Sequence, residues 1–442
     1  MRAESAITVD LGTDWEPRDA PRPGRSAWRQ VTAAGLVLAT VLVGILGGSA
    51  APRPALIRVA SIPSGITDTI ELIGDRLFVL GRNAKRLDAY ALPTGRHLWR
   101  LGWAQQVDTL RVDAALGVLL VETFDVTRPE GTVTALELNT GRTLWQQSGG
   151  LLSAQARDVD GAALLAPVDP AAAGALRLVD VRTGAVRWSR AVAATTGFAA
   201  AGPDRIIQRS PMGDTQIVEL STGRVLASGV LGGLDPRIAK GLPPDPGAVP
   251  SVEMVDGLVF LLYHAVYPTT VVAYDGGTFR ERWQATEDGR VYWVARCGLV
   301  LCVGGEQGVT GVDPTTGAAR WHATAWPGAY PVGDGSRAVV LGATGDEASA
   351  LLDTATGRVE LAMHAWVPVS PPADPPLVTF SEVGRLGVWV GVLDVVRAQV
   401  SPLAWLSGIA NLCQQDGPDP GHTYLACVTP SGSTEVWWYR SV

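Results

Sequence analysis

The chain has 442 residues, of which 47% are hydrophobic and 18% are charged. This balance is typical of a folded protein and excludes a disordered chain. The formal net charge of −7 argues against a nucleic-acid partner, because phosphate binding needs a basic surface.

The N-terminal part predicts a membrane anchor. Residues 1–30 are polar and contain prolines, so we expect a disordered cytoplasmic tail. Residues 31–50 carry no charge, and at helical rise they are long enough to cross a bilayer core as one transmembrane helix. More arginines precede this stretch than follow it, which places the C-terminal part outside the cytoplasm. The alternative is a signal peptide cleaved after the small residues at 48–50. Both interpretations place the rest of the chain outside the cytoplasm. Residues 51–54 are predicted to be a linker between the helix and the domain that begins at residue 55.

A nine-residue phrase recurs along the rest of the chain. Its clearest copy is DVRTGAVRW at 180–188: an acid first, Thr-Gly at the fourth and fifth positions, and tryptophan last. The residues that define the three complete copies are Glu137, Thr140, Gly141, Trp145, Asp180, Thr183, Gly184, Trp188, Asp313, Thr316, Gly317 and Trp321. Partial copies lie at 91–99, 219–227, 275–283, 353–361 and 394–402. A period of roughly forty residues in a chain of short apolar runs is typical of a propeller.

The phrase has the chemistry of a turn followed by an outer strand. The acid can accept hydrogen bonds from backbone N–H groups two or three residues on, and the glycine supplies a positive φ. The tryptophan then lies where it can cover a neighbouring unit. One stretch shows the whole unit, with four strands predicted at 291–295, 299–303, 308–312 and 318–323. Such a four-stranded meander is a propeller blade, and blades must stack because one alone cannot bury both of its faces.

These residues resemble the quinoprotein-type, pyrroloquinoline-quinone-like repeat family over residues 55–442. The resemblance implies that each tryptophan packs on the Thr-Gly turn of the next blade, and that seven or eight blades form an all-β propeller. The number of copies favours eight. Two further strands around Gly432 could close the ring with a strand from residues 55–61, so one of the last two units is expected to be incomplete. WD-type repeats are not indicated, because no motif tryptophan is followed by aspartate.

All four cysteines lie on the predicted exported side: Cys297, Cys302, Cys413 and Cys427. An even number in an oxidising compartment predicts two disulfides. Three pairings are open, and we favour Cys297–Cys302 and Cys413–Cys427, each linking neighbouring strands of one blade. A metal site is the alternative, although no histidine stands near either pair at ligand spacing. Free buried thiols would follow if the topology were reversed.

No catalytic, cofactor-binding or metal-binding residue is predicted. The chain has no Gly-Lys dipeptide and no Gly-x-Ser-x-Gly, and its five histidines are isolated. His322 follows a motif tryptophan and is predicted to be a surface strand residue. Loops between second and third strands, and crossings between blades, emerge on the face opposite the Thr-Gly turns. We expect any binding there, and the alternative is that these loops are tolerated insertions. They are 127–131, 210–215, 232–250, 264–270 and 367–376.

Two functions follow from the sequence. The first is a membrane-anchored, extracytoplasmic propeller that binds an unknown protein or small ligand without catalysis. The second, which the resemblance implies, is a quinoprotein dehydrogenase with bound pyrroloquinoline quinone and calcium. Such an enzyme needs a carboxylate base and oxygen ligands, and many add a disulfide between adjacent cysteines. No two cysteines are adjacent here, and no cofactor is expected.

Overall fold

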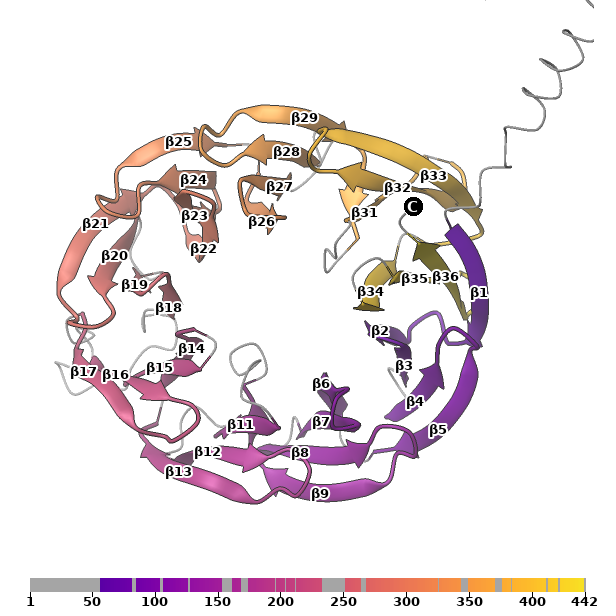
Figure 1. The fold of residues 1–442 in the computed structure, drawn as a ribbon, viewed down its shortest axis with the longest axis horizontal. Coiled ribbons are helices and arrows are strands. Elements are labelled where there is room, and N and C mark those ends of the chain that lie inside the picture. Colours follow the sequence, from indigo (N-terminus) through magenta and orange to yellow (C-terminus); the bar gives the residue numbers. More distant parts are fainter. Residues whose placement is uncertain are drawn as a thin grey trace, which may run out of the picture. The chain divides into compact units, whose positions relative to one another are not determined.

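Nine four-stranded antiparallel sheets make up the described part of the chain. The computed structural model describes residues 56–440 apart from 82–84, 104–105, 126–127, 153–160, 168–173, 195, 203, 211, 233–250, 264–267, 325, 343–348, 370–375, 383, 411 and 420–421. These residues belong to one compact unit, Ala55–Val442. Its sheets stand around a ring as the blades of a propeller (Figure 1).

The blades are numbered here from the first complete one, and each is given from its innermost to its outermost strand. Blades 1 to 3 are β2 (Thr69–Ile73), β3 (Arg76–Gly81), β4 (Arg86–Ala91) and β5 (Arg96–Gly102); β6 (Gln106–Asp113), β7 (Val118–Asp125), β8 (Arg128–Glu137) and β9 (Thr143–Ser148); and β10 (Gly150–Leu151), β11 (Ala162–Ala166), β12 (Gly174–Asp180) and β13 (Val186–Val192). Blades 4 to 6 are β14 (Gly197–Ala200), β15 (Arg205–Arg209), β16 (Asp214–Glu219) and β17 (Val225–Val230); β18 (Ser251–Val255), β19 (Leu258–Tyr263), β20 (Thr269–Asp275) and β21 (Glu281–Glu287); and β22 (Val291–Cys297), β23 (Val300–Gly305), β24 (Gly308–Val312) and β25 (Ala319–Ala323). Blades 7 and 8 are β26 (Gly328–Val332), β27 (Arg337–Leu341), β28 (Ser349–Asp353) and β29 (Val359–His364); and β30 (Val367–Pro368), β31 (Leu377–Phe380), β32 (Gly387–Asp394) and β33 (Gln399–Ser407). Blade 9 is β34 (Cys413–Asp419), β35 (His422–Val428), β36 (Ser433–Arg440) and β1 (Leu56–Pro63).

The ring closes by joining the two ends of the propeller. Strand β1 pairs antiparallel with β36, from Leu56 opposite Tyr439 to Pro63 opposite Ser433. The predicted closing strand at 55–61 is therefore confirmed. The four strands predicted at 291–323 are likewise confirmed as β22 to β25.

The prediction of seven or eight blades was wrong, because the structure has nine. The phrase is the connection between the third and fourth strands of a blade. Blade 9 takes its fourth strand from the other end of the chain, so it has no such connection and no copy. Eight copies therefore correspond to nine blades. Blade 9 is also complete, contrary to the expectation of an incomplete final unit.

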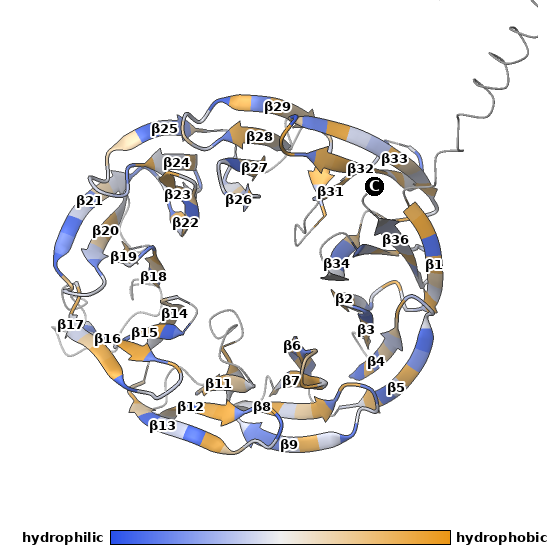
Figure 2. Ribbon diagram, viewed as in Figure 1, coloured by the Kyte–Doolittle hydropathy of each residue, from blue (hydrophilic) through white to orange (hydrophobic). Residues whose placement is uncertain are grey.

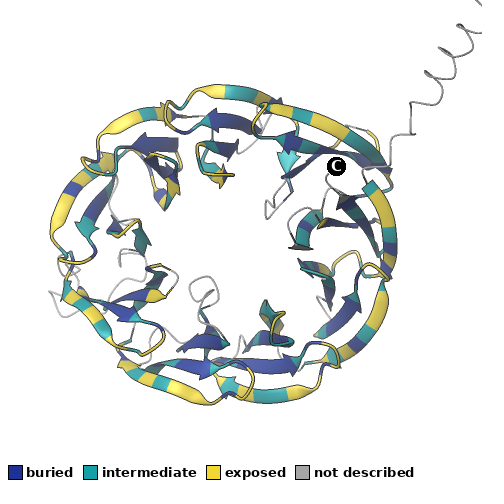
Figure 3. Cartoon of the chain, viewed as in Figure 1, coloured by how far each residue is buried: buried dark blue, intermediate teal, exposed yellow. Residues whose placement is uncertain are grey.

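The core lies between blades. Second and third strands are buried on both faces, as β23 and β24 show, whereas outer strands expose much of their surface (Figure 3). The same strands carry most of the apolar residues (Figure 2). One cluster, for example, joins Phe78 and Leu87 of blade 1 to Leu119 and Leu136 of blade 2. Each blade thus buries its faces only against its neighbours.

The predicted cytoplasmic tail, transmembrane helix and linker lie outside the described residues. Within the described residues, no helix has the length and apolar character needed to span a membrane.

The closing strand yields a test of stability. Ile62 of β1 is fully buried against Ile70 and Leu77 of blade 1, whereas Ile57 on the same strand is 47% exposed. Replacing Ile62 with alanine should lower the free energy of unfolding by about 2–5 kcal/mol, because the change removes buried methyl groups and leaves a cavity. Ile57→Ala is the matched control and should change it by less than about 0.5 kcal/mol. Denaturant unfolding of the full chain measures the free energy of unfolding of both variants. Equal decreases would contradict a stabilising role for the buried face of β1.

Candidate functional site

The acid and the glycine of the phrase close a tight turn. In the copy at 180–188, Asp180 Oδ1 accepts hydrogen bonds from the N–H of Arg182 (3.1 Å) and from the N–H and hydroxyl of Thr183 (2.9 Å each). The N–H of Gly184 donates to the carbonyl of Asp180 (2.8 Å), and Gly184 has φ 71°. Only glycine adopts this conformation without steric cost. The acid is therefore engaged in holding its own turn.

The second oxygen of the same acid pairs with an arginine seven residues on. Arg187 Nη2 lies 2.9 Å from Asp180 Oδ2, and Arg282 pairs with Asp275 in the same way (2.6 Å). The hydrogen bond from Arg187 lowers the pKa of Asp180 to about 2, and burial opposes part of that effect. A carboxylate held in its charged form by its neighbours is a poor general base near neutral pH.

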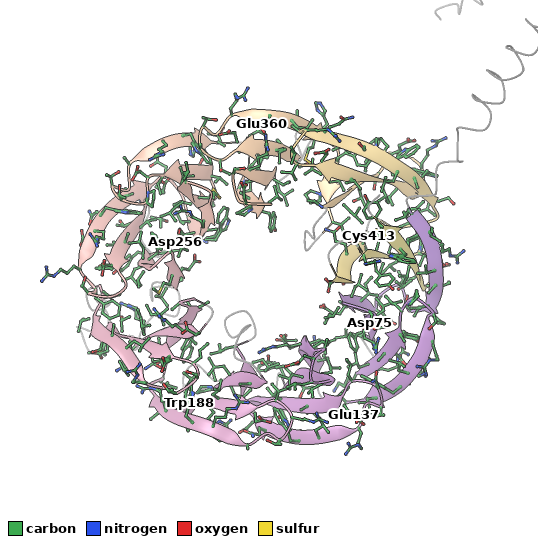
Figure 4. The ribbon with its side chains drawn as sticks, in the orientation of Figure 1. Asp75, Glu137, Trp188, Asp256, Glu360 and Cys413 are labelled. Atoms are coloured by element: carbon green, nitrogen blue, oxygen red, sulfur yellow. A yellow bond between two sulfur atoms is a disulfide. The ribbon has the colours of Figure 1, made fainter. Side chains whose placement is uncertain are left out.

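The tryptophan of the phrase binds the next blade. Trp188 of blade 3 (Figure 4) donates its indole N–H to the carbonyl of Leu220 in blade 4 (2.7 Å). Its ring lies on Gly223, where an added Cβ would stand only 2.8 Å from a ring atom. The equivalent indole bonds are Trp99 to Leu138 (2.8 Å), Trp145 to Val181 (2.8 Å), Trp283 to Pro314 (3.0 Å) and Trp321 to Thr354 (2.9 Å). The glycine is thus required by its φ and also by the ring that covers it.

Four of the nine junctions have no such indole bond among the described residues, and at two of these both blades carry a copy of the phrase. Between blades 4 and 5 the tryptophan position is Ala227, and the glycine position is Phe279, with φ 53°. The ring of Phe279 reaches back over Gly229, where an added Cβ would lie 2.8 Å from it. An aromatic ring thus fills the gap from the opposite side. Between blades 7 and 8, Leu361 and Ala398 replace tryptophan and glycine and pack in one cluster.

The reversed junction can be tested by restoring the common arrangement. Phe279→Gly should lower the free energy of unfolding by about 1–3 kcal/mol, because it removes the ring that fills the junction. Ala227→Trp alone should also destabilise the chain, because the indole would meet Phe279. The double variant should recover most of either loss, giving a favourable coupling in a double-mutant cycle measured by unfolding. Strictly additive losses would contradict the reversed packing.

The turn acid gives a pH dependence with a defined sign. Because the folded-state pKa of Asp180 is depressed, its contribution is present above the unfolded value of about 3.9 and is lost as the pH falls toward 2. Asp180→Asn should therefore lower the melting temperature at pH 7, and the difference from wild type should shrink between about pH 4 and pH 2. Asp204→Asn, at an exposed acid outside the phrase, is the control. A difference that stays constant with pH would contradict this role.

Both disulfides form with the pairing that the sequence favours. Cys297 bonds Cys302 between β22 and β23, and Cys413 bonds Cys427 between β34 and β35. These are all four cysteines of the chain. Each bond joins neighbouring strands within one blade, so the disulfides brace blades 6 and 9 and leave no thiol for catalysis or metal binding.

We use the term loop face for the side of the ring that carries the loops between second and third strands and the crossings between blades. The phrase face is the opposite side. Parts of the loops predicted for binding, 233–250, 264–267 and 370–375 among them, lie outside the described residues. The prediction that 367–376 is a crossing between blades was wrong, because β30 and β31 are the first and second strands of blade 8 and this stretch joins them. The described loop face nevertheless holds two groups of polar side chains that lie beside blade 5.

The first group surrounds Arg209 at the loop-face end of β15. Its side chain is only 2% exposed. Nε and Nη2 donate to the carbonyl of Leu231 (3.2 and 3.1 Å), and Nη1 donates to that of Ser210 (3.4 Å). Burial lowers the pKa of Arg209, while nearby Tyr263 and Tyr274, in their ionised form, raise it. A cation is therefore buried between blades 4 and 5.

The second group lies between blades 5 and 6. Thr310 Oγ1 lies 3.1 Å from Glu287 Oε2, to which it donates, and 2.9 Å from His322 Nδ1. The hydroxyl has one proton, so donation to Glu287 leaves His322 Nδ1 as the donor to Thr310. Burial raises the pKa of Glu287, and the hydrogen bond from Thr310 partly opposes this. The three side chains thus form a chain of hydrogen bonds. Because Thr310 is buried, its hydroxyl does not face solvent as that of a nucleophile would.

Sequence reasoning missed both groups. His322 is exposed, as predicted. Its bond to Thr310 depends on the register between β24 and β25, which the sequence pattern does not give. Arg209 ends an apolar strand just before the predicted loop at 210–215, and the longest interval between phrase copies follows it. A charged residue at the end of an apolar strand, close to this long interval, was the signal in the sequence that could have pointed to the Arg209 group.

A bound quinone with calcium would need ligands among the described residues. Among them, no three His, Cys, Asp or Glu side chains are grouped so that they could hold a metal ion. The disulfides join cysteines five and fourteen positions apart, so neither forms the bond between adjacent cysteines that many quinoproteins have.

The family model described as outer membrane protein assembly factor BamB matches residues 20–234. No curated protein matches the chain. Among solved structures, BamB from Moraxella catarrhalis is 15% identical, with a TM-score of 0.45, covering 86% of this chain and 97% of that one. A europium-containing methanol dehydrogenase is 12% identical, with a TM-score of 0.45, covering 87% and 93%. The WD40 domain of Sif2 is 9% identical, with the same TM-score, covering 86% and 97%.

These structures are at most 15% identical to the chain, with TM-scores of 0.45, so they assign no function. The resemblance to a family rests on the phrase and on the family model. The copies of the phrase form the turns and junctions described above, and the match to the model covers the first of them. The chain is thus similar to the pyrroloquinoline-quinone-like β-propeller proteins, through the phrase and through the family model that matches residues 20–234.

Proposed function

We propose that the chain is a single-pass membrane protein whose propeller lies outside the cytoplasm and binds a protein or small ligand without catalysis. Residues 31–50 are its anchor and residues 1–30 its cytoplasmic tail. Two disulfides support export, because such bonds persist in oxidising compartments and are rare in the cytosol. The greater number of arginines before residue 31 supports the same orientation.

One observation carries the binding role. The acids, glycines and tryptophans that the blades share are engaged in turns and junctions, as Asp180, Gly223 and Trp188 show. The polar groups built around Arg209 and Thr310 lie instead on the loop face, beside a single blade. Loops on a rigid scaffold are where proteins place binding residues. The matching family model is named for an assembly factor, which favours a protein as the partner.

Photo-crosslinking from the two faces tests this proposal. A photoreactive amino acid is placed at Met212 or Leu386 on the loop face, and at Leu299 or Val396 on the phrase face as matched controls. All four side chains are exposed, from 48% at Met212 to 81% at Val396. In intact cells, a discrete adduct of constant mass should form from the loop-face positions only, because that face holds the blade-specific residues.

Two further measurements separate the alternatives. A protease added outside the cells should remove the propeller, and complete protection beside a cleaved external control would refute export. Purified full chain should show no stoichiometric quinone binding and no calcium-dependent dye reduction. Either activity would establish the dehydrogenase, and adducts confined to the phrase face would overturn the loop-face assignment.

A further inference from the structure

Two charged side chains are buried among the described residues, Asp88 and Arg209. The charge of Asp88 is compensated on three sides. Arg86 Nε lies 2.7 Å from one of its oxygens, and Arg100 Nε (2.6 Å) and His97 Nε2 (3.1 Å) lie near the other. This is the usual condition for burying a charge, because an uncompensated ion is costly to remove from water.

Arg209 is buried without that compensation. Its hydrogen bonds go to the main-chain carbonyls of Leu231 and Ser210. No carboxylate in the described part of the chain pairs with it, and the charged or titratable groups that influence it are Tyr263 and Tyr274 of blade 5. Both phenols are neutral at pH 7, because burial raises their pKa values further. Carbonyl oxygens satisfy N–H groups but do not neutralise a guanidinium.

Gly232 lies beside this cation, and the Tyr263 hydroxyl and Leu261 fill the place that a side chain on it would take. An added Cβ there would stand 3.3 Å from Arg209 Nη2 and would collide with the hydroxyl of Tyr263. The backbone of Gly232 is also hydrogen bonded to Tyr274, and its φ is 73°. A planar guanidinium and two phenol hydroxyls therefore converge on one glycine at the loop-face end of the junction between blades 4 and 5. The Nε–Nη2 edge of Arg209 already donates to Leu231, so the Nη1–Nη2 edge is the one to meet two oxygens of a carboxylate or phosphate group.

The same junction is unusual in its packing. It lacks the indole bond of the common junctions, because position 227 is alanine and Phe279 fills the space from blade 5. The longest interval between phrase copies also falls here. The uncompensated cation thus lies at a junction whose aromatic ring, Phe279, comes from the following blade.

We propose that this junction binds a small oxyanion, a carboxylate or phosphate group, with Arg209 as its counter-charge and Tyr263 and Tyr274 as hydrogen-bond donors. The anion supplies the negative charge that the described residues do not. The proposal rests on the proposed function in one respect, since it names the ligand chemistry for the loop face.

The test uses purified full chain with inorganic phosphate or acetate as the probe. Each replaces chloride at constant pH and ionic strength, and the melting temperature is followed against probe concentration. An anion that binds only the folded chain should raise it saturably. Saturation separates binding from the general effect of kosmotropic salts, which keeps rising with concentration. A response to phosphate alone assigns a phosphate site, and a response to acetate alone assigns a carboxylate site.

Variants locate the effect. Arg209→Leu should abolish the saturable rise, and Arg209→Lys should weaken it at least tenfold in midpoint, because lysine lacks the fork. Arg177→Gln is the matched control and should keep it, since Arg177 also binds a neighbouring main-chain carbonyl, that of Ser148, but is half-exposed. If Arg209→Leu fails to fold, the wild-type chain is titrated with each anion and its magnetic resonance is followed. Saturable broadening of the phosphorus or acetate-methyl signal supports an anion site, and no broadening contradicts it.

No saturable response to either anion, or an equal response in Arg209→Leu, would overturn the site. In that case Arg209 is a tether for the Leu231 carbonyl only. This result would leave the crosslinking pattern unaffected, because that experiment depends on which face meets a partner. Conversely, phrase-face adducts beside an Arg209-dependent anion response would refute the proposed function and retain the site.

Discussion

The contact between an indole ring and a glycine turn on the next blade is the interaction on which the ring depends. A four-stranded sheet of this size cannot cover both of its faces, so each blade needs a neighbour on either side. Apolar packing between sheets is not directional. The bond from Trp188 to the carbonyl of Leu220, and the fit of its ring on Gly223, supply direction and register. The outer edges of the blades are thereby fixed while the apolar middle strands pack.

The exceptions show what the contact must achieve. At Ala227 and Phe279 the aromatic ring comes from the other blade, and at Leu361 and Ala398 two medium-sized side chains share the space. In each case volume is exchanged across the junction, so the gap between blades stays filled. Phe279 and Ala398 keep the positive φ of the glycine they replace. The turn geometry is therefore retained even where the docking partner changes, which indicates that turn and docking are separable requirements.

Much of the fold followed from the sequence because its determinants are local. The Thr-Gly turn, the alternating strands and the cysteine spacing each act within one blade, and the structure has them where the pattern placed them. The number of blades did not follow, because the closing blade joins Leu56 to Tyr439 across the whole chain and so lacks the local signal. The surroundings of Arg209 were hidden for a related reason. Its burial depends on Leu231, Gly232 and Tyr263, which meet only after two blades pack.

The pairing of β1 with β36 also orders the assembly of the molecule. A ring closed by its first and last strands cannot finish until the last strand is available, and closing so long a loop is slow because the entropy of closure precedes the gain from contacts. Until then β1 has no strand partner, so its backbone groups are open to wrong pairing. The outward faces of blades 1 and 8 are apolar and uncovered, so they are open to wrong contacts. For a chain made from its N-terminus, the segment synthesised first in the propeller is the segment that docks last. Among the strands of the propeller, β1 therefore waits longest between its synthesis and its pairing.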